Sequence, residues 1–184
     1  MNKTKILCVI DMQNDFIDGV LGTKEAVAIV DNVVEKINNY KERSEWIIAT
    51  QDTHYSDYLE TLEGKNLPIV HCLANSHGWQ LNNRVFSALK NYSNKVILTK
   101  NIFGSKKLIN FLKTIIDEKN YDEFEIELVG LVLDICVVSN ALLLKTNFPN
   151  TKIVIDASCT AGTSKEKFEK AKVVLKSCQV DVYE

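Results

Sequence analysis

The chain has 184 residues, with 22 basic and 24 acidic side chains, and apolar residues make up 46% of it. This length suits one domain with its own hydrophobic core, residues 1–184, and is short for two. A formal net charge of −2 gives no reason to expect a nucleic acid or an anionic membrane as partner. The apolar fraction also argues against a disordered or fibrous chain.

The first apolar run, at residues 6–10, is too short for a secretory signal, and no run reaches the roughly 18 apolar residues of a membrane span. The chain has an odd number of cysteines and no Cys-x-x-Cys pair; they are Cys8, Cys72, Cys136, Cys159 and Cys178. We therefore expect a cytoplasmic protein with reduced thiols, most of them small buried side chains.

Short apolar runs rich in Ile and Val alternate along the chain with longer amphipathic stretches, which predicts buried strands alternating with helices. In chain order we expect a strand at 6–10, a helix at about 25–41, strands at 46–49 and 96–98, a helix at 105–118, a strand at 126–131, a helix at 136–146, a strand at 153–155, a helix at 165–176 and a weaker strand at 180–183. This order predicts an α/β fold with three layers, α/β/α, around a Rossmann-like, mostly parallel sheet of about six strands.

Reactive side chains follow four of the predicted strands. Asp11 follows the first strand, Asp52 and His54 the second, Lys100 the third and Cys136 the fourth. Each one alone is more often a cap, a solvated charge or a buried cysteine. Sites in such folds lie beyond the carboxyl ends of the strands, however, and all these residues belong to that one edge.

These residues suit nucleophilic catalysis. A thiol becomes a nucleophile when it loses its proton, and we expect Cys136 to open a helix whose dipole favours the thiolate. Asp11 could take that proton and later deliver it to a leaving amine, while Lys100 offsets the charge that the two share. Backbone N–H groups at the helix start could hold a developing oxyanion. A papain-like pair of Cys136 with one of the three histidines stays open at this point.

A second cluster contains Asp52, His54 and His71. Alternate residues of an extended chain face the same way, so Asp52 and His54 can point to one side. Nitrogen and oxygen ligands with open positions suit a catalytic divalent metal such as zinc, iron or manganese. The alternative is a pair of loop histidines that are hydrogen-bonded to the backbone.

Five segments together resemble the isochorismatase-like cysteine hydrolase superfamily, which includes the nicotinamidases. They are VIDMQNDF at 9–16, TQDTH at 50–54, LPIVHC at 67–72, TKNIFGS at 99–105 and GLVLDICV at 130–137. The resemblance covers nearly the whole chain. It implies the fold expected above and an enzyme that hydrolyses a small amide through a cysteine thioester.

The resemblance also implies roles for individual residues. Asp11, Lys100 and Cys136 correspond to the catalytic triad. A cis peptide bond is implied between Leu131 and Val132, which would aim the Val132 N–H into an oxyanion hole beside the N–H of Cys136. The implied pocket aromatic is Phe16, and the implied ligands of one divalent metal are Asp52, His54 and His71, with Glu63 as the candidate fourth ligand and Glu60 behind it.

Two departures from the family pattern bear on the substrate. Leu133 stands where the family usually has Thr, and Leu67 and Pro68 occupy the stretch where an aromatic often stacks on a pyridine ring. Hydrolysis of nicotinamide to nicotinate and ammonia is the first hypothesis, and an amidase for another small amide or carbamoyl compound is the second. An isochorismatase-type vinyl-ether hydrolase is disfavoured because such members lack the cysteine, and a non-catalytic binding protein is disfavoured by the intact triad. The family often forms dimers or tetramers, so a homo-oligomer stays open.

Overall fold

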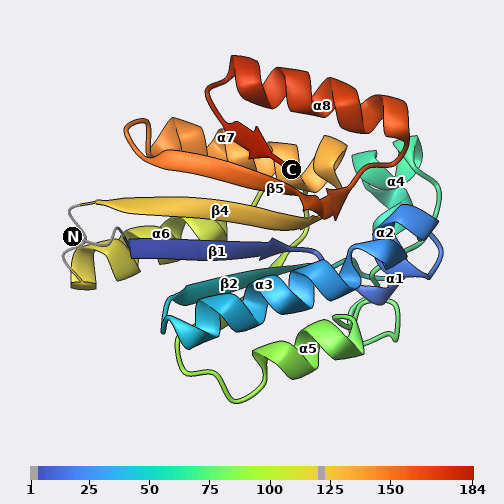
Figure 1. Ribbon diagram of the computed structural model, residues 1–184. Coiled ribbons are helices and arrows are strands. Elements are labelled where there is room, and N and C mark those ends of the chain that lie inside the picture. Colours follow the sequence, from blue (N-terminus) through green and yellow to red (C-terminus); the bar gives the residue numbers. More distant parts are fainter. Residues whose placement is uncertain (1–3, 120–122) are drawn as a thin grey trace.

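The computed structural model describes residues 4–119 and 123–184, and its centre is a six-stranded parallel sheet in the order β3-β2-β1-β4-β5-β6 (Figure 1). The strands are β1 (Thr4–Ile10), β2 (Trp46–Asp52), β3 (Lys95–Lys100), β4 (Phe124–Leu131), β5 (Lys152–Ala161) and β6 (Asp181–Tyr183). The predicted α/β fold is confirmed, including its weak sixth strand.

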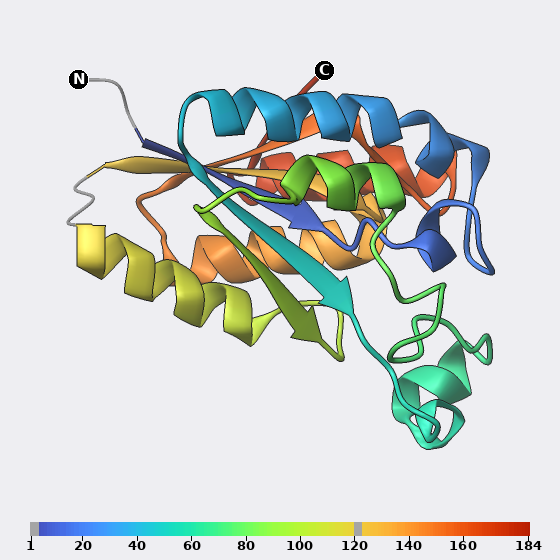
Figure 2. The same cartoon turned by 90° about the horizontal axis from the view of Figure 1, so that it is seen from below.

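Helices cover both faces of the sheet. They are α1 (Asn14–Ile17), α2 (Lys24–Ala28), α3 (Val30–Glu42), α4 (Leu62–Asn66), α5 (Asn83–Leu89), α6 (Lys106–Lys119), α7 (Val138–Asn147) and α8 (Lys165–Ser177), with a 3-10 turn η1 (Tyr58–Glu60) and a π-helical turn η2 (Leu133–Val137). Figure 2 shows α3 and α5 on one side of the sheet and α6 and α7 on the other. Within the described ranges, no helix is both long and apolar enough to cross a membrane.

The core has two halves because successive residues of a strand face opposite sides of the sheet. In β1, Leu7 and Val9 pack with α3 and α5. Ile6, Cys8 and Ile10 pack with α6, α7 and α8. The central strands are therefore apolar at nearly every position, which is why they could be recognised in the sequence as continuous runs.

Three predicted boundaries are wrong in instructive ways. The helix expected at 25–41 is two helices that meet at Ile29, whose near-helical backbone (φ −83°, ψ −11°) lets the apolar spacing continue through the break. The helix expected from Cys136 is preceded by η2, which begins at Leu133. The strand expected at 153–155 extends from Lys152 to Ala161. Its second half contains polar residues, so the apolar run that was used to predict the strand is shorter than the strand itself.

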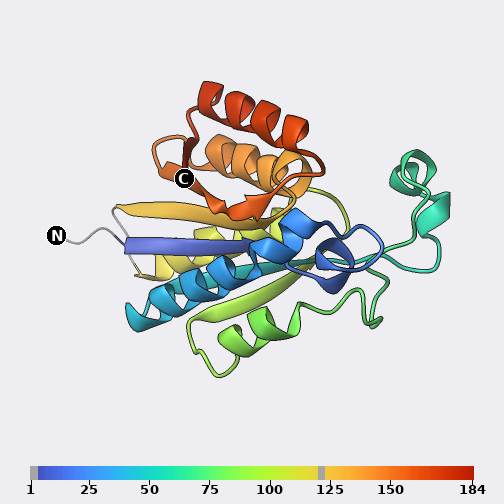
Figure 3. The same ribbon diagram turned by 45° about the vertical axis from the view of Figure 1, so that its right-hand side comes forward.

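Gly130 brings the two central strands together next to the site. Its φ is +108°, a conformation that L side chains rarely adopt, and a Cβ there would lie 2.1 Å from the carbonyl oxygen of Ile10. The ends of β1 and β4 can therefore approach closely only because this residue has no side chain. Beyond these ends, the segment that carries η1 and α4 extends past the body of the sheet (Figures 2 and 3).

Candidate active site

Lys100 is the meeting point of the buried charged groups at this edge of the sheet. It ends β3, and its Nζ lies 2.7 Å from Asp11 Oδ2, 3.1 Å from Asp52 Oδ1 and 3.5 Å from Cys136 Sγ. Burial alone would lower the pKa of Lys100, but the charges of Asp11 and Asp52 help to raise it above its ordinary value. The group is therefore an ammonium ion held among acidic neighbours.

Asp11 is oriented by the neighbouring strand. It follows β1 with a φ of +47°, which is uncommon for a residue other than glycine. Its Oδ1 accepts a hydrogen bond of 2.7 Å from the Thr50 hydroxyl, and its backbone N–H donates to the same hydroxyl at 3.3 Å. Among the described residues, Oδ2 is fully buried and has no hydrogen-bond partner beyond its ion pair with Lys100.

Cys136 lies in the π-helical turn η2, just after a cis peptide bond between Leu131 and Val132. Such turns occur most often as short insertions at functional sites. The buried Asn140 side chain holds this turn by donating hydrogen bonds to the carbonyl oxygens of Cys136 at 2.8 Å and Phe103 at 3.0 Å. These two hydrogen bonds connect the turn that carries the thiol to the loop that follows Lys100.

The burial and the charges around Cys136 act against the thiolate that the helix start is expected to favour. Burial raises the pKa of Cys136 well above its ordinary value, the Asp11 charge raises it further, and Lys100 offsets only part of this. Burial also raises the pKa of Asp11, against the lowering effect of Lys100 and Thr50. The raised pKa of Cys136 favours the protonated thiol, so the proposed attack needs a base beside it.

A second cluster lies on the far side of Asp52 from Lys100. His54 Nε2 lies 3.0 Å from Asp52 Oδ2 and 3.6 Å from Glu63 Oε1, and His71 Nε2 lies 3.7 Å from Asp52 Oδ2. One ligand atom from each of these four residues falls within 4.8 Å of all the others. Glu60, by contrast, is exposed and lies outside the cluster, so Glu63 is the better candidate of the two.

Protonation and orientation suit metal binding in this cluster. His71 Nδ1 lies 2.8 Å from the carbonyl oxygen of Ile69, and donating a proton to it leaves the lone pair of Nε2 free toward the cluster. Burial raises the pKa of Asp52, but the neighbouring His54 and His71 and the charge of Lys100 outweigh it and hold that pKa well below the ordinary range. Two imidazole nitrogens and two carboxylate oxygens form a donor set that fits zinc, iron or manganese.

The sequence reasoning missed the residues that hold this cluster in place. Asp15 Oδ2 accepts a 2.7 Å hydrogen bond from the Cys72 N–H, next to His71. The side-chain amide of Gln13 makes two hydrogen bonds with the backbone of Asp52: it accepts from the N–H at 2.6 Å and donates to the carbonyl oxygen at 2.8 Å. Both lie in the segment 9–16 that carries the family resemblance, but their roles become visible only when the loops are folded together.

A cavity of about 380 Å³ connects the two clusters. Cys136 and Val132 line it, and so do Asp52, Glu63 and His71. Phe16 lies in its wall, with its ring centroid 5.5 Å from that of His71, and Phe103 and Leu67 also line the cavity. The volume suits a small molecule that touches both clusters.

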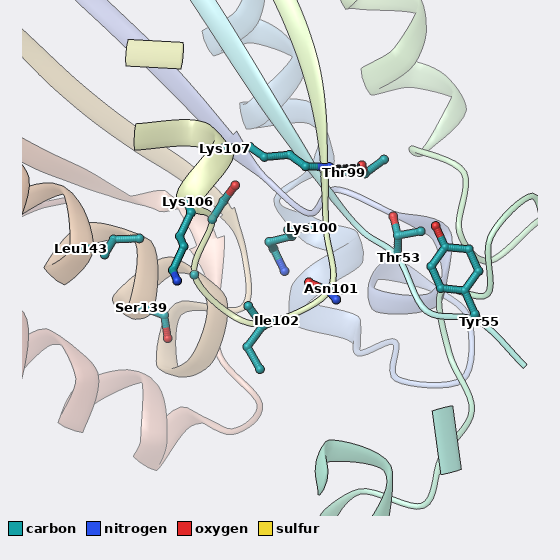
Figure 4. Close-up of a pocket in the computed structure, with 12 residues that line it drawn as sticks. Thr53, Tyr55, Thr99, Lys100, Asn101, Ile102, Lys106, Lys107, Ser139 and Leu143 are labelled. Atoms are coloured by element: carbon teal, nitrogen blue, oxygen red, sulfur yellow. Dashed lines mark hydrogen bonds between the residues drawn. The ribbon is translucent and has the colours of Figure 1, made fainter. Parts of the chain in front are cut away.

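A larger cavity of about 710 Å³ lies beside it, lined by residues such as Thr53, Tyr55 and Ile102 (Figure 4). Lys100 borders this space, but neither Cys136 nor any of the four residues of the second cluster does. Size alone therefore does not locate the chemistry. We place the candidate active site in the smaller cavity, which is lined by Cys136 and by Asp52, Glu63 and His71 of the second cluster.

Comparison with known proteins agrees with this geometry. Residues 5–183 match the isochorismatase domain family. The chain belongs to this family. It is 26% identical to the nicotinamidase of Saccharomyces cerevisiae, over 97% of this chain and 98% of the yeast protein.

Two solved structures extend the comparison. The nicotinamidase/pyrazinamidase PncA from Bacillus subtilis superposes with a TM-score of 0.84 at 25% identity, covering 98% of this chain and all of that one. The pyrazinamidase of Pyrococcus horikoshii, solved in complex with zinc, gives a TM-score of 0.76 at 22% identity with 98% of each chain covered. The second likeness is evidence for the fold alone.

Proposed function

We propose that this protein is a cysteine amidohydrolase that converts a small carboxamide, with nicotinamide as the first candidate, to the acid and ammonia. The observation that carries the proposal is the contact of Lys100 with both Asp11 and Cys136, together with a cavity that is lined by Cys136 and by Asp52, Glu63 and His71 of the four-residue cluster. The yeast and Bacillus relatives, both named as nicotinamidases, support this substrate.

The reaction begins with the protonated thiol of Cys136. Asp11 accepts its proton through Oδ2, and the thiolate attacks the carbonyl carbon of the amide. The N–H groups of Val132 and Cys136 hold the oxyanion, and Lys100 balances the charge shared by the acid and the thiol. Asp11 then gives its proton to the departing ammonia, which leaves a thioester on Cys136. Asp11 next takes a proton from water, and the hydroxide releases the carboxylic acid and restores the thiol.

Asp52, His54 and His71, together with Glu63, are the residues that would hold one divalent ion such as zinc, iron or manganese. When bound, this ion would supply a Lewis acid for the ring nitrogen of a pyridine carboxamide. Phe16 offers an aromatic wall next to His71. A substrate held between these groups would present its carboxamide to Cys136, and such orientation contributes much of the rate in enzymes.

A second candidate substrate class follows from one feature of the wall. Leu67 lines the cavity in the stretch where an aromatic side chain would stack on a pyridine ring. A leucine favours an aliphatic group as readily as a ring. Another small amide or carbamoyl compound is therefore the alternative substrate.

Ammonia release from nicotinamide, benzamide and an aliphatic amide tests the proposal, with and without chelator. Benzamide keeps the ring and the amide but lacks the ring nitrogen. We expect nicotinamide to be hydrolysed fastest, chelator to remove that advantage, and Cys136→Ala to abolish turnover. If nicotinamide is turned over no faster than benzamide and the aliphatic amide is preferred, the second candidate replaces the first.

A further inference from the structure

Thr50 lies in β2 with its side chain fully buried, next to the carboxylate proposed as the base. Its hydroxyl donates to Asp11 Oδ1 at 2.7 Å and accepts from the Asp11 N–H at 3.3 Å. One hydroxyl group thus ties both the side chain and the backbone of Asp11 to the neighbouring strand. The residue is otherwise a β-branched side chain in a strand, and the sequence analysis placed it in the segment at 50–54 without giving it a role.

This contact makes the two oxygens of Asp11 different. Oδ1 is occupied by the Thr50 hydroxyl, whereas Oδ2 faces Lys100 at 2.7 Å and, in the described parts of the chain, has no other partner. The terminal torsion of a carboxylate has broad preferences, so the side chain itself does not select this orientation. Without the hydroxyl, Oδ1 would be a buried acceptor with no donor and could turn toward the ammonium.

We infer that Thr50 is a positioning residue, whose hydroxyl fixes Asp11 so that Oδ2 stays directed at Lys100 and Cys136. The inference rests on the proposed function only through the role given to Asp11. Three charged or titratable groups face this carboxylate: Lys100 from β3, Asp52 from β2 and Cys136 from η2. Burial raises the pKa of Asp11, and the Thr50 hydrogen bond is among the contacts that lower it again because the donor stabilises the charged form.

Two substitutions separate this role from simple packing. Thr50→Val keeps the size and the β-branch and removes the hydroxyl, whereas Thr50→Ser keeps the hydroxyl and removes a methyl group. Thr160→Val is the matched control, because Thr160 is also a buried threonine of the sheet and its hydroxyl bonds to the carbonyl oxygen of Ala157 at 3.3 Å. Circular dichroism and thermal melting establish that each variant folds, and Thr50→Ala replaces the valine variant if that one does not.

The first measurement needs no substrate. The protein is labelled with ¹³C at the aspartate carboxyl carbons and titrated by NMR, and the Asp11 signal is assigned by its loss in Asp11→Asn. In Thr50→Val we expect Asp11 to titrate at higher pH than in the parent protein. Thr50→Ser and Thr160→Val should both titrate like the parent.

The second measurement is ammonia release. A hydrogen bond to a charged group is worth enough to change a rate by about tenfold or more, so kcat of Thr50→Val should fall by at least that factor while KM changes little. The serine variant should recover most of kcat. A valine variant with the parent's titration and kcat, or a serine variant as impaired as the valine one, would overturn the inference. If nicotinamide is not hydrolysed at all but the titration shift is present, the proposed substrate fails and the positioning role stands.

Discussion

Replacing Asp11 by asparagine removes one proton acceptor and little else from the buried cluster. Asparagine has nearly the same size, and its side-chain oxygen can still accept the Thr50 hydrogen bond. Lys100 would keep Asp52 as a carboxylate partner at 3.1 Å, so its charge stays compensated and the fold should persist. Positioned acid–base groups contribute about 10²- to 10⁴-fold to a rate. We therefore expect kcat to fall by at least about a hundredfold, which corresponds to about 2.7 kcal/mol in the barrier.

The assay is ammonia release followed over a range of pH, with thermal melting as the control for folding. In the parent protein, kcat/KM should fall as the pH drops and the base takes up a proton. Because burial raises the pKa of Asp11, this acid limb should lie above the 3.8 of an ordinary aspartate. The limb should disappear from the residual activity of Asp11→Asn. A variant within a few-fold of the parent, or one that keeps the same limb, would show that another group is the base.

Three further results are expected from the same geometry. Cys136→Ala should fold normally and release no ammonia. In a separate experiment, Cys178→Ser removes the exposed thiol, and iodoacetamide should then modify Cys136, which lines the cavity, before the other buried cysteines. Equal labelling of these cysteines by mass spectrometry would contradict the proposed role of Cys136. His54→Ala combined with His71→Ala should reduce bound metal from about one ion per chain to none by elemental analysis, and full retention would rule out the site. Asp15→Ala should weaken metal binding in calorimetry without removing a ligand, because it removes the acceptor of the hydrogen bond from the Cys72 N–H; unchanged affinity would show that this contact is dispensable.

The sequence predicted the fold because the sheet is parallel and covered on both faces. Strands in such sheets are continuous apolar runs, and their ends were marked by Asp11, Asp52 and Lys100, which do lie at the ends of β1, β2 and β3. The rule that sites lie beyond these ends then brought together residues far apart in the chain. Chain order and strand direction were sufficient for this step, without any knowledge of side-chain contacts.

The parts that could not be predicted depend on contacts rather than on pattern. The π-helical turn around Cys136 has no distinct residue spacing, and the Asn140 side chain that fastens it lies in the following helix without any visible signal. The raised pKa of Cys136 comes from burial, which the dipole argument from sequence did not include. Short segments such as η1 and α4, which carry Glu63 toward the cluster, are too brief to show a period.

Asp52 belongs to both halves of the site, which decides how the metal can be tested. Its Oδ1 lies 3.1 Å from Lys100, and its Oδ2 lies 3.0 Å from His54. Any substitution of Asp52 would remove a proposed ligand and a partner of the ammonium together, so its effect could not be assigned. His54 and His71 approach only Oδ2, and the double alanine variant leaves the pairs of Lys100 with both carboxylates in place. That variant should hydrolyse benzamide at the parent's rate and lose only the advantage of nicotinamide. An equal loss for both amides would mean that the cluster supports the nucleophile itself and does not serve the ring nitrogen.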